Sequence, residues 1–226
     1  MVTVIAFDVN ETLLDLRALD QPFDELLGDS SWRGQWFAQM LQLSFVGGLT
    51  GEYLDFSRAQ HAALAMVAAR AGRTVSAEQT ASMVDRMTAL PAHTEVAAAL
   101  SKLRATPLKI VALVNSLHAV GEAQLRYAGI REHFDEVISA DEVGRLKPAP
   151  EPYRLVADRY GVPIAEVRLV AAHAWDVSGA LAAGAQAAFE ARPGMVLSPV
   201  GAQPDIVGRD LDEVVDAVIE IDVAGR

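Results

Sequence analysis

The chain has 226 residues, of which 51% are hydrophobic and 22% are charged, a composition typical of a packed globular protein that has room for an inserted smaller domain. A formal net charge of −11 argues against a nucleic-acid partner or an acidic membrane surface. The absence of cysteine excludes disulfides, zinc–thiolate sites and a thiol nucleophile. No signal-peptide pattern opens the sequence and no apolar run reaches the length of a membrane span, so we expect a cytoplasmic protein.

The first predicted element is a buried strand at 2–7, VTVIAF, and a wholly helical segment follows it. Helical periodicity predicts four helices, near 19–28, 32–46, 52–71 and 76–89. Ser76 and Gln79 have the spacing of a capping box at the start of the fourth helix. Residues 17–91 are therefore predicted to form an all-helical cap inserted after the first strand.

Beyond the cap, short apolar strands alternate with helices, and Gly129, Gly161 and Gly184 stand where helices are expected to end. The strands are predicted at 108–114, 134–140, 167–172, 185–191 and 204–208. This alternation is typical of an α/β fold with a parallel sheet covered by helices on both faces. The predicted core comprises residues 1–16 and 92–226, and its ligands should lie beyond the carboxyl ends of the strands.

Polar residues with catalytic chemistry follow the predicted strands. Asp8 ends the first strand in FDVNETLLD, and taken alone it is more simply a turn or helix-cap residue. Asn115 and Ser116 end the second strand, Lys147 lies in DEVGRLKPAPEPY, and Asp176 lies in AAHAWDVSGALAAG. This order resembles the four motifs of the haloacid dehalogenase superfamily and more closely its (S)-2-haloacid dehalogenases. The resemblance spans nearly the whole chain and implies a Rossmann-like core with a helical cap.

The departures from the superfamily's phosphatases are informative. Phosphoryl transfer from an alkyl ester needs an acid to protonate the departing alkoxide, and Asn10 stands where those phosphatases carry an Asp. Ala171 and Ala172 stand where they carry a Gly-Asp pair that binds Mg²⁺. A halide leaves without protonation, so these residues favour carbon–halogen cleavage without a metal or other cofactor.

The cap segment SSWRGQW places Arg33 early in the second predicted helix. The resemblance implies that Arg33, Asn115 and Trp175 cradle the departing halide. Donors aimed at the place where charge develops are what a leaving halide needs. The simpler alternative for Arg33 is a solvated arginine on a helix surface.

The resemblance also implies the mechanism, in which Asp8 attacks the halogen-bearing carbon, forms an ester and is regenerated by water. Lys147 should keep Asp8 ionised, because a nearby cation lowers the pKa of a carboxylate. Ser116 and the backbone N–H groups near Asn10 are candidates to bind the substrate carboxylate. Thr12 is a candidate to hydrogen-bond the Asp8 loop, although it could equally cap a helix.

Two residues compete for activating the hydrolytic water. The resemblance implies Asp176, whereas His173 stands where many related dehalogenases carry Asn and could serve as the base. The bulk of His173 could also narrow the pocket and favour short haloacids, including fluoroacetate. Val114 lacks the hydroxyl that Ser or Thr supplies at this place in the superfamily, so either Ser116 or a backbone donor replaces it or substrate binding is weakened.

The leading interpretation is a hydrolase of short 2-haloalkanoic acids that acts on a small anionic substrate. One rival is a phosphatase of a small phosphomonoester, and another is a catalytically weakened relative that only binds a ligand. Family analogy implies a homodimer.

Overall fold

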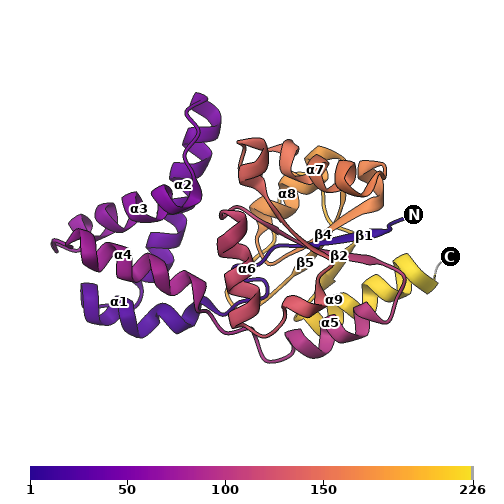
Figure 1. Cartoon of the computed structure of the whole chain (residues 1–226), viewed down its shortest axis with the longest axis horizontal. Helices are drawn as coiled ribbons and strands as arrows, with labels where there is room; N and C mark the ends of the chain where they lie inside the picture. The colour runs from indigo at the N-terminus through magenta and orange to yellow at the C-terminus, as the bar shows by residue number, and fades with distance from the viewer. Residues whose placement is uncertain (225–226) are drawn as a thin grey trace.

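The computed structural model describes residues 1–224, and its centre is a parallel six-stranded sheet with the strand order β3-β2-β1-β4-β5-β6 (Figure 1). The strands are β1 (Val4–Phe7), β2 (Lys109–Val114), β3 (Glu136–Ser139), β4 (Val167–Ala171), β5 (Gln186–Glu190) and β6 (Ile206–Gly208). All six predicted strands are confirmed, each one to three residues shorter than its apolar run. The apolar runs in the sequence are longer than the hydrogen-bonded strands because residues next to a strand, such as Val2 and Leu108, are also buried.

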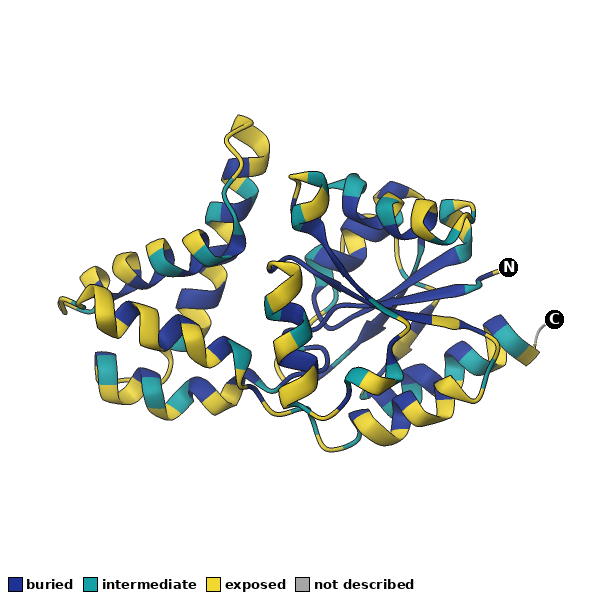
Figure 2. Ribbon diagram, viewed as in Figure 1, coloured by how far each residue is buried: buried dark blue, intermediate teal, exposed yellow. Residues whose placement is uncertain are grey.

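Successive side chains of β1 face opposite sides of the sheet, as the pleat requires. Ile5 and Phe7 pack in the core under α5 (Val96–Arg104), α6 (His118–Tyr127) and α9 (Leu211–Val218). Val4 and Ala6 pack in the core under α7 (Pro150–Tyr160) and α8 (Ala174–Ala183). Both faces of the sheet are therefore covered, which explains why the strands read as continuous apolar runs (Figure 2).

The segment between β1 and β2 is helical, as predicted. It contains α1 (Asp20–Leu27), α2 (Trp32–Thr50), α3 (Phe56–Arg70) and α4 (Ala77–Asp85), flanked by the 3₁₀ helices η1 (Leu16–Leu19) and η2 (Arg86–Thr88). The capping box of Ser76 and Gln79 is present in both directions. Figure 1 shows these helices gathered at the end of the molecule toward which β1 runs from the N-terminus. The boundary of this cap at residues 17 and 91 remains a prediction.

The cap has an apolar interior of its own. Trp36 is fully buried, lies 5.3 Å from the ring of Phe23 and donates its indole N–H to the carbonyl oxygen of Gln60 at 3.0 Å. Phe56, the first residue of α3, is buried in the same cluster.

The remaining elements are short: η3 (Arg131–His133), η4 (Ala140–Val143), η5 (Ile164–Glu166) and a final π-helical turn, η6 (Ile219–Ala224). Within residues 1–224, no helix is both long and apolar enough to cross a membrane.

Candidate active site

The polar residues that follow β1, β2 and β4 come together because these three strands are neighbours with aligned ends. Phe7, the last residue of β1, pairs with Ala112 of β2 and Val170 of β4. Asp8 thereby enters the crevice between the residues that follow the two flanking strands. This is the position in which parallel α/β sheets bind ligands.

Asp8, Lys147 and Asp176 form a buried charge cluster. The Lys147 ammonium donates to Asp8 Oδ1 at 2.9 Å and to Asp176 Oδ2 at 2.6 Å, and all three side chains are at least nine-tenths buried. The three predicted residues are thus brought into direct contact. One cation shared between two carboxylates leaves one negative charge uncompensated within this triad.

The pKa values of the two carboxylates of this cluster are shifted in opposite directions. Burial raises the pKa of Asp8, but the charge of Lys147 and the hydrogen bonds from His173 and Lys147 outweigh burial and hold that pKa well below its usual range. Burial raises the pKa of Asp176, and the Asp8 charge adds to that effect while Lys147 opposes it. Burial lowers the pKa of Lys147, but Asp176 and Asp8 more than compensate and raise it. Asp8 is therefore ionised at neutral pH.

Thr12 fixes the orientation of the Asp8 carboxylate. Its hydroxyl donates to Asp8 Oδ2 at 2.7 Å and accepts from the backbone N–H of Ala172 at 3.0 Å. The Thr12 carbonyl oxygen in turn accepts from Arg192 Nε at 2.9 Å. Of the two alternatives for Thr12, the hydrogen bond within the Asp8 loop is the one present.

Asn115 positions Lys147 through its backbone. Its Oδ1 accepts from the Lys147 N–H at 2.7 Å, and its Nδ2 donates to the Lys147 carbonyl oxygen at 3.3 Å. On the far side, Tyr153 donates its hydroxyl to Asp176 Oδ1. Asn115 and Tyr153 thus hold the cation and its second carboxylate in place.

His173 lies between two carboxylates. Its Nδ1 is 3.1 Å from Asp8 Oδ2 and its Nε2 is 2.8 Å from Glu11 Oε2, while the rings of Phe37 and Trp175 stack on it at centroid distances of 5.5 and 5.3 Å. Burial lowers the pKa of His173, but the hydrogen bonds to Asp8 and Glu11 outweigh burial and raise that pKa to about 9. The resting ring is therefore an imidazolium at neutral pH.

Arg33 contacts the site through Glu11. Its Nε donates to Asp20 Oδ1 at 2.5 Å, and its Nη1 lies 3.5 Å from Glu11 Oε1. Trp175 lies near the cluster, with its ring centroid 5.9 Å from Lys147 Nζ, and it packs edge-on against Phe45 of α2. Trp175 therefore lies near the nucleophile. The Arg33 guanidinium contacts Asp20 and Glu11, and the Asn115 amide contacts the Lys147 backbone.

Two buried donors beside the cluster are unsatisfied. Ser116 Oγ and Trp175 Nε1 have no hydrogen-bond partner among the described residues. Buried polar groups are normally paired, so unpaired ones at a candidate site point to a ligand that completes them. Both residues were predicted to bind substrate or halide.

Asn10 and Val114 face helix α6 instead of offering a group to a substrate. Asn10 Oδ1 accepts from Gln124 Nε2 at 2.9 Å. Val114 is buried in the core, and its methyl groups approach within 3.1 Å of the place where a Cβ on Gly121 would stand. Valine at this position therefore serves packing.

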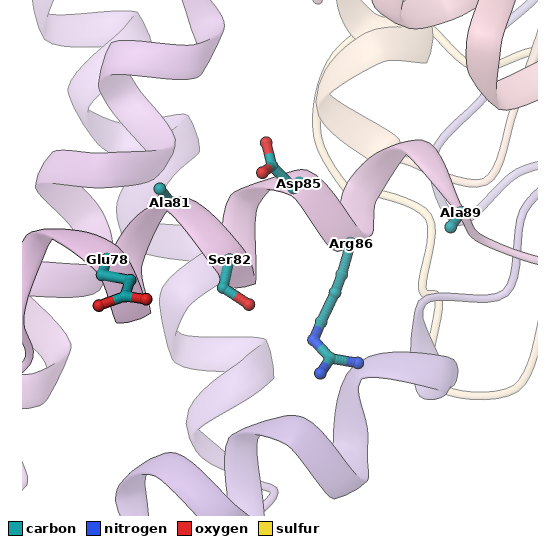
Figure 3. Close-up of a pocket in the computed structure, with 6 residues that line it drawn as sticks. All are labelled: Glu78, Ala81, Ser82, Asp85, Arg86 and Ala89. Carbon is teal, nitrogen blue, oxygen red and sulfur yellow. The ribbon is translucent and has the colours of Figure 1, made fainter.

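A cavity of about 530 Å³ lies beside the site. Glu11, Arg33, His93 and Arg192 are among its lining residues, so Glu11 joins this space to His173. A separate, more open hollow on the outer side of α4 is lined by Glu78, Ala81, Ser82, Asp85, Arg86 and Ala89 (Figure 3). Neither hollow is lined by Asp8, Lys147 or Asp176, but the first reaches the site through Glu11, which contacts His173.

Sequence reasoning missed three residues of the site: Glu11, Phe37 and Tyr153. Glu11 is adjacent to Asn10 in the nucleophile loop, and Tyr153 stands six residues after Lys147, so their motifs offered a local signal. The only sequence signal for Phe37 is its position one helical turn after Arg33, because its contact with His173 joins the cap to the core.

Lys147 places a positive charge between Asp8 and Asp176. Its ammonium lies within 2.9 Å of both carboxylates that could otherwise bind a divalent cation. The side chain of Ala172 is a methyl group that cannot bind a metal ion, and its backbone N–H is bonded to Thr12. Among residues 1–224, no group of three or more His, Asp or Glu side chains is arranged to hold a metal ion.

Comparison with known proteins gives a consistent result. The profile of the haloacid dehalogenase-like hydrolases matches residues 2–184. An (S)-2-haloacid dehalogenase of Xanthobacter autotrophicus is 31% identical over 194 residues, covering 85% of this chain and 76% of the relative. The (S)-2-haloacid dehalogenase 2 of Pseudomonas sp. (strain CBS-3) is 29% identical over 216 residues, or 93% of each chain.

Among solved structures, the L-2-haloacid dehalogenase of Xanthobacter autotrophicus with chloropropionic acid covalently bound superposes with a TM-score of 0.90. It is 26% identical in sequence, and the match covers 96% of this chain and 98% of that one.

Proposed function

The chain belongs to the haloacid dehalogenase-like hydrolase family, and we propose that it hydrolyses short 2-haloalkanoic acids to the corresponding 2-hydroxy acids. One observation carries this proposal most directly: a buried, ionised Asp8 is bonded to Lys147, while no acid stands at position 10. Such a site has a nucleophile and a countercharge but lacks a proton donor for an alkoxide. It suits a leaving group that departs as an anion.

The first step is displacement at carbon. Asp8 Oδ2 accepts hydrogen bonds from Thr12 and faces His173, whereas Oδ1 accepts one from Lys147, so Oδ1 retains more of its electron density for attack. An electron pair of Oδ1 forms the bond to the halogen-bearing carbon, and the carbon–halogen pair leaves with the halide. The unpaired N–H of Trp175 is the proposed donor to that halide, and the unpaired hydroxyl of Ser116 the proposed donor to the substrate carboxylate.

The second step is hydrolysis of the Asp8 ester. Water adds to Cγ of Asp8 and negative charge develops on Oδ2, where the Thr12 hydroxyl already donates. His173 is the proposed base, because its Nδ1 lies 3.1 Å from Oδ2. Both oxygens of Asp176 are bonded, to Lys147 and to Tyr153, so we propose that it orients the lysine instead of activating water.

Arg33 and Asn115 keep supporting roles in this proposal. Asn115 holds the Lys147 backbone, and Arg33 reaches the site from the cap through Glu11. Family resemblance also supports a homodimer, for which exposed Val46 and Leu49 at the end of α2 offer an apolar surface.

The phosphatase alternative fits these residues poorly. The Asn10 amide is bonded to Gln124 and cannot protonate an alkoxide, and Ala172 has no carboxylate where the phosphatases carry the acid that binds Mg²⁺. We therefore propose that no metal is required. A ligand-binding relative without turnover would not need a nucleophile with so low a pKa.

We expect the protein to release halide from chloroacetate, bromoacetate and (S)-2-chloropropionate at equal rates with and without EDTA. Fluoroacetate tests the proposed narrowing by His173 and should release fluoride above the buffer blank. An ion-selective electrode measures each rate, and p-nitrophenyl phosphate with Mg²⁺ serves as the counter-substrate. Phosphate release without any halide release would support the phosphatase instead.

A further inference from the structure

Glu11 is an acidic side chain of the nucleophile loop to which neither the fold nor the proposed reaction has assigned a role. Its backbone has a φ of +63°, the left-handed region that residues with a Cβ rarely adopt. The strain is held by a hydrogen bond from its N–H to the Leu14 carbonyl oxygen at 3.0 Å, and His93 Nε2 lies 3.2 Å from its own carbonyl oxygen. A strained residue held by its surroundings often marks a functional position.

This conformation aims the Glu11 carboxylate at His173. Glu11 Oε2 is 2.8 Å from His173 Nε2, and Oε1 is 3.5 Å from Arg33 Nη1. His173 Nδ1, on the other side of the ring, is 3.1 Å from Asp8 Oδ2. A continuous chain therefore runs from the nucleophile through the imidazole and the Glu11 carboxylate to the cap arginine.

The orientation of the imidazole ring is fixed as well as its partners. Phe37 and Trp175 stack on the His173 ring with interplanar angles of 18° and 25°. Stacking against these two aromatic rings opposes a rotation of the imidazole that would exchange its nitrogens. Nε2 thus stays on Glu11 and Nδ1 stays on the reacting carboxylate.

We propose that Glu11 is a positioning residue that holds the His173 proton on Nε2, so that Nδ1 takes a proton from the hydrolytic water once Asp8 is esterified. The inference rests on the proposed dehalogenase function. The role is analogous to that of the carboxylate that orients the histidine in a hydrolytic triad.

The protons of His173 and of the hydrolytic water balance over one turnover. In the resting enzyme His173 carries two protons, one facing each carboxylate. Ester formation removes the negative charge of Asp8, and the Nδ1 proton is then lost to solvent as the net proton of the reaction. Neutral Nδ1 takes a proton as the water oxygen bonds to Cγ, and it returns that proton to the alkoxide when the Cγ–Oδ1 bond breaks. The second proton of the water, left on the new Asp8 carboxyl, restores the imidazolium.

The charged groups around His173 support this sequence. Asp8 and Glu11 face its two nitrogens, Lys147 lies beyond Asp8 with Asp176 behind it, and Arg33 lies beyond Glu11. The pKa of His173 is raised to about 9 while both facing carboxylates are charged. Esterification leaves only Glu11 as an anionic partner, so that pKa falls at the stage that needs a base.

The test is Glu11→Gln, which keeps the shape of the side chain and removes its charge. With excess 2-chloropropionate and rapid acid quenching, mass spectrometry measures ester formation and ester hydrolysis separately. We expect hydrolysis to slow by about 10²-fold, the scale of general-base catalysis, and the ester to accumulate. Ester formation should change by less than a few-fold, because the Lys147 contact with Asp8 remains.

A double-mutant cycle with His173→Asn shows whether Glu11 acts through the imidazole. Glu11→Gln should have no further effect on hydrolysis in the His173→Asn background. In the parent background, NMR titration of the His173 ring should show a lower pKa after Glu11→Gln, a readout that a purely structural role would not move. Glu78→Gln, on the outer side of α4 (Figure 3), is the matched control and should change neither step.

Unchanged ester hydrolysis in Glu11→Gln, or equal slowing with and without His173, would overturn the inference. Neither result would affect the proposed function, because the Asp8 ester would still form. Absence of any ester in the parent protein would instead remove the proposed function itself.

Discussion

Replacing Asp8 by asparagine is expected to lower halide release by at least about 10⁴-fold, because the amide lacks the anionic oxygen that attacks carbon. Asn keeps the shape of the side chain but has a single carbonyl oxygen, so only one of the two donors, Thr12 or Lys147, keeps an acceptor. Initial rates of chloride release from (S)-2-chloropropionate measure the loss. Asp8→Ala excludes activity that arises from deamidation of the amide back to the acid.

The matched control is Asp24→Asn, an exposed carboxylate on α1 outside the site. Its rate should equal that of the parent. Halide release by Asp8→Ala at a rate near the parental one would mean that another group attacks the substrate, and the assignment of the nucleophile would be wrong.

Replacing Lys147 by methionine is expected to lower both activity and stability. The change leaves Asp8 and Asp176 buried side by side without their shared cation, and breaking a buried pair in this way costs about 3–5 kcal/mol. The pKa of Asp8 should rise for the same reason, so less of the nucleophile is ionised. We expect halide release at pH 7 to fall by at least about 10³-fold. Urea unfolding measures the loss of stability.

The pH range in which Lys147→Met loses stability follows from the directions in which the pKa values of Asp8 and Lys147 are shifted. Asp8 has a lowered pKa in the folded protein, so its contribution is present above the unfolded pKa and is lost as the pH falls through the folded one. Lys147 has a raised pKa, so its contribution is present below the unfolded pKa and is lost as the pH rises through the folded one. The deficit of Lys147→Met should therefore be largest between about pH 4 and pH 10.

Lys109→Met is the matched control for this prediction, since Lys109 is a half-exposed lysine whose nearest acid, Asp135, is 3.8 Å away. Surface changes of this kind usually alter the free energy of unfolding by less than about 0.5 kcal/mol. Equal losses in the two variants would show that the buried cluster has no special energetic role.

The fold was predictable because local patterns and global structure agree. Strands β1 and β4 are largely apolar runs buried on both faces, and helices end at glycines that adopt positive φ, as at Gly129, Gly161 and Gly184. The strand-end residues were predictable for a related reason. Parallel strands align their carboxyl ends, so the motifs that follow them meet at one edge of the sheet. This places Asp8 and Asp176 close together, and Lys147 of the third motif contacts both.

The partners of individual side chains were less predictable. Arg33 contacts Glu11 and Asp20, which its motif did not indicate, because a guanidinium bonds the carboxylates within its reach. Its role at the halide stays a prediction. Glu11 itself went unnoticed because its effect depends on a backbone conformation that is rare for glutamate. His173 was recognised as unusual, yet its imidazolium state depends on both carboxylates, which come from another part of the chain.

The covalent role of Asp8 is the central claim, and a single turnover in ¹⁸O-labelled water tests it most directly. With protein in excess over (S)-2-chloropropionate, water that attacks Cγ leaves its oxygen in the Asp8 carboxylate, so the peptide containing Asp8 should gain the isotope while the hydroxy acid does not. Label in the hydroxy acid after one turnover, with none in that peptide, would mean that water attacks the substrate carbon directly and would contradict the mechanism.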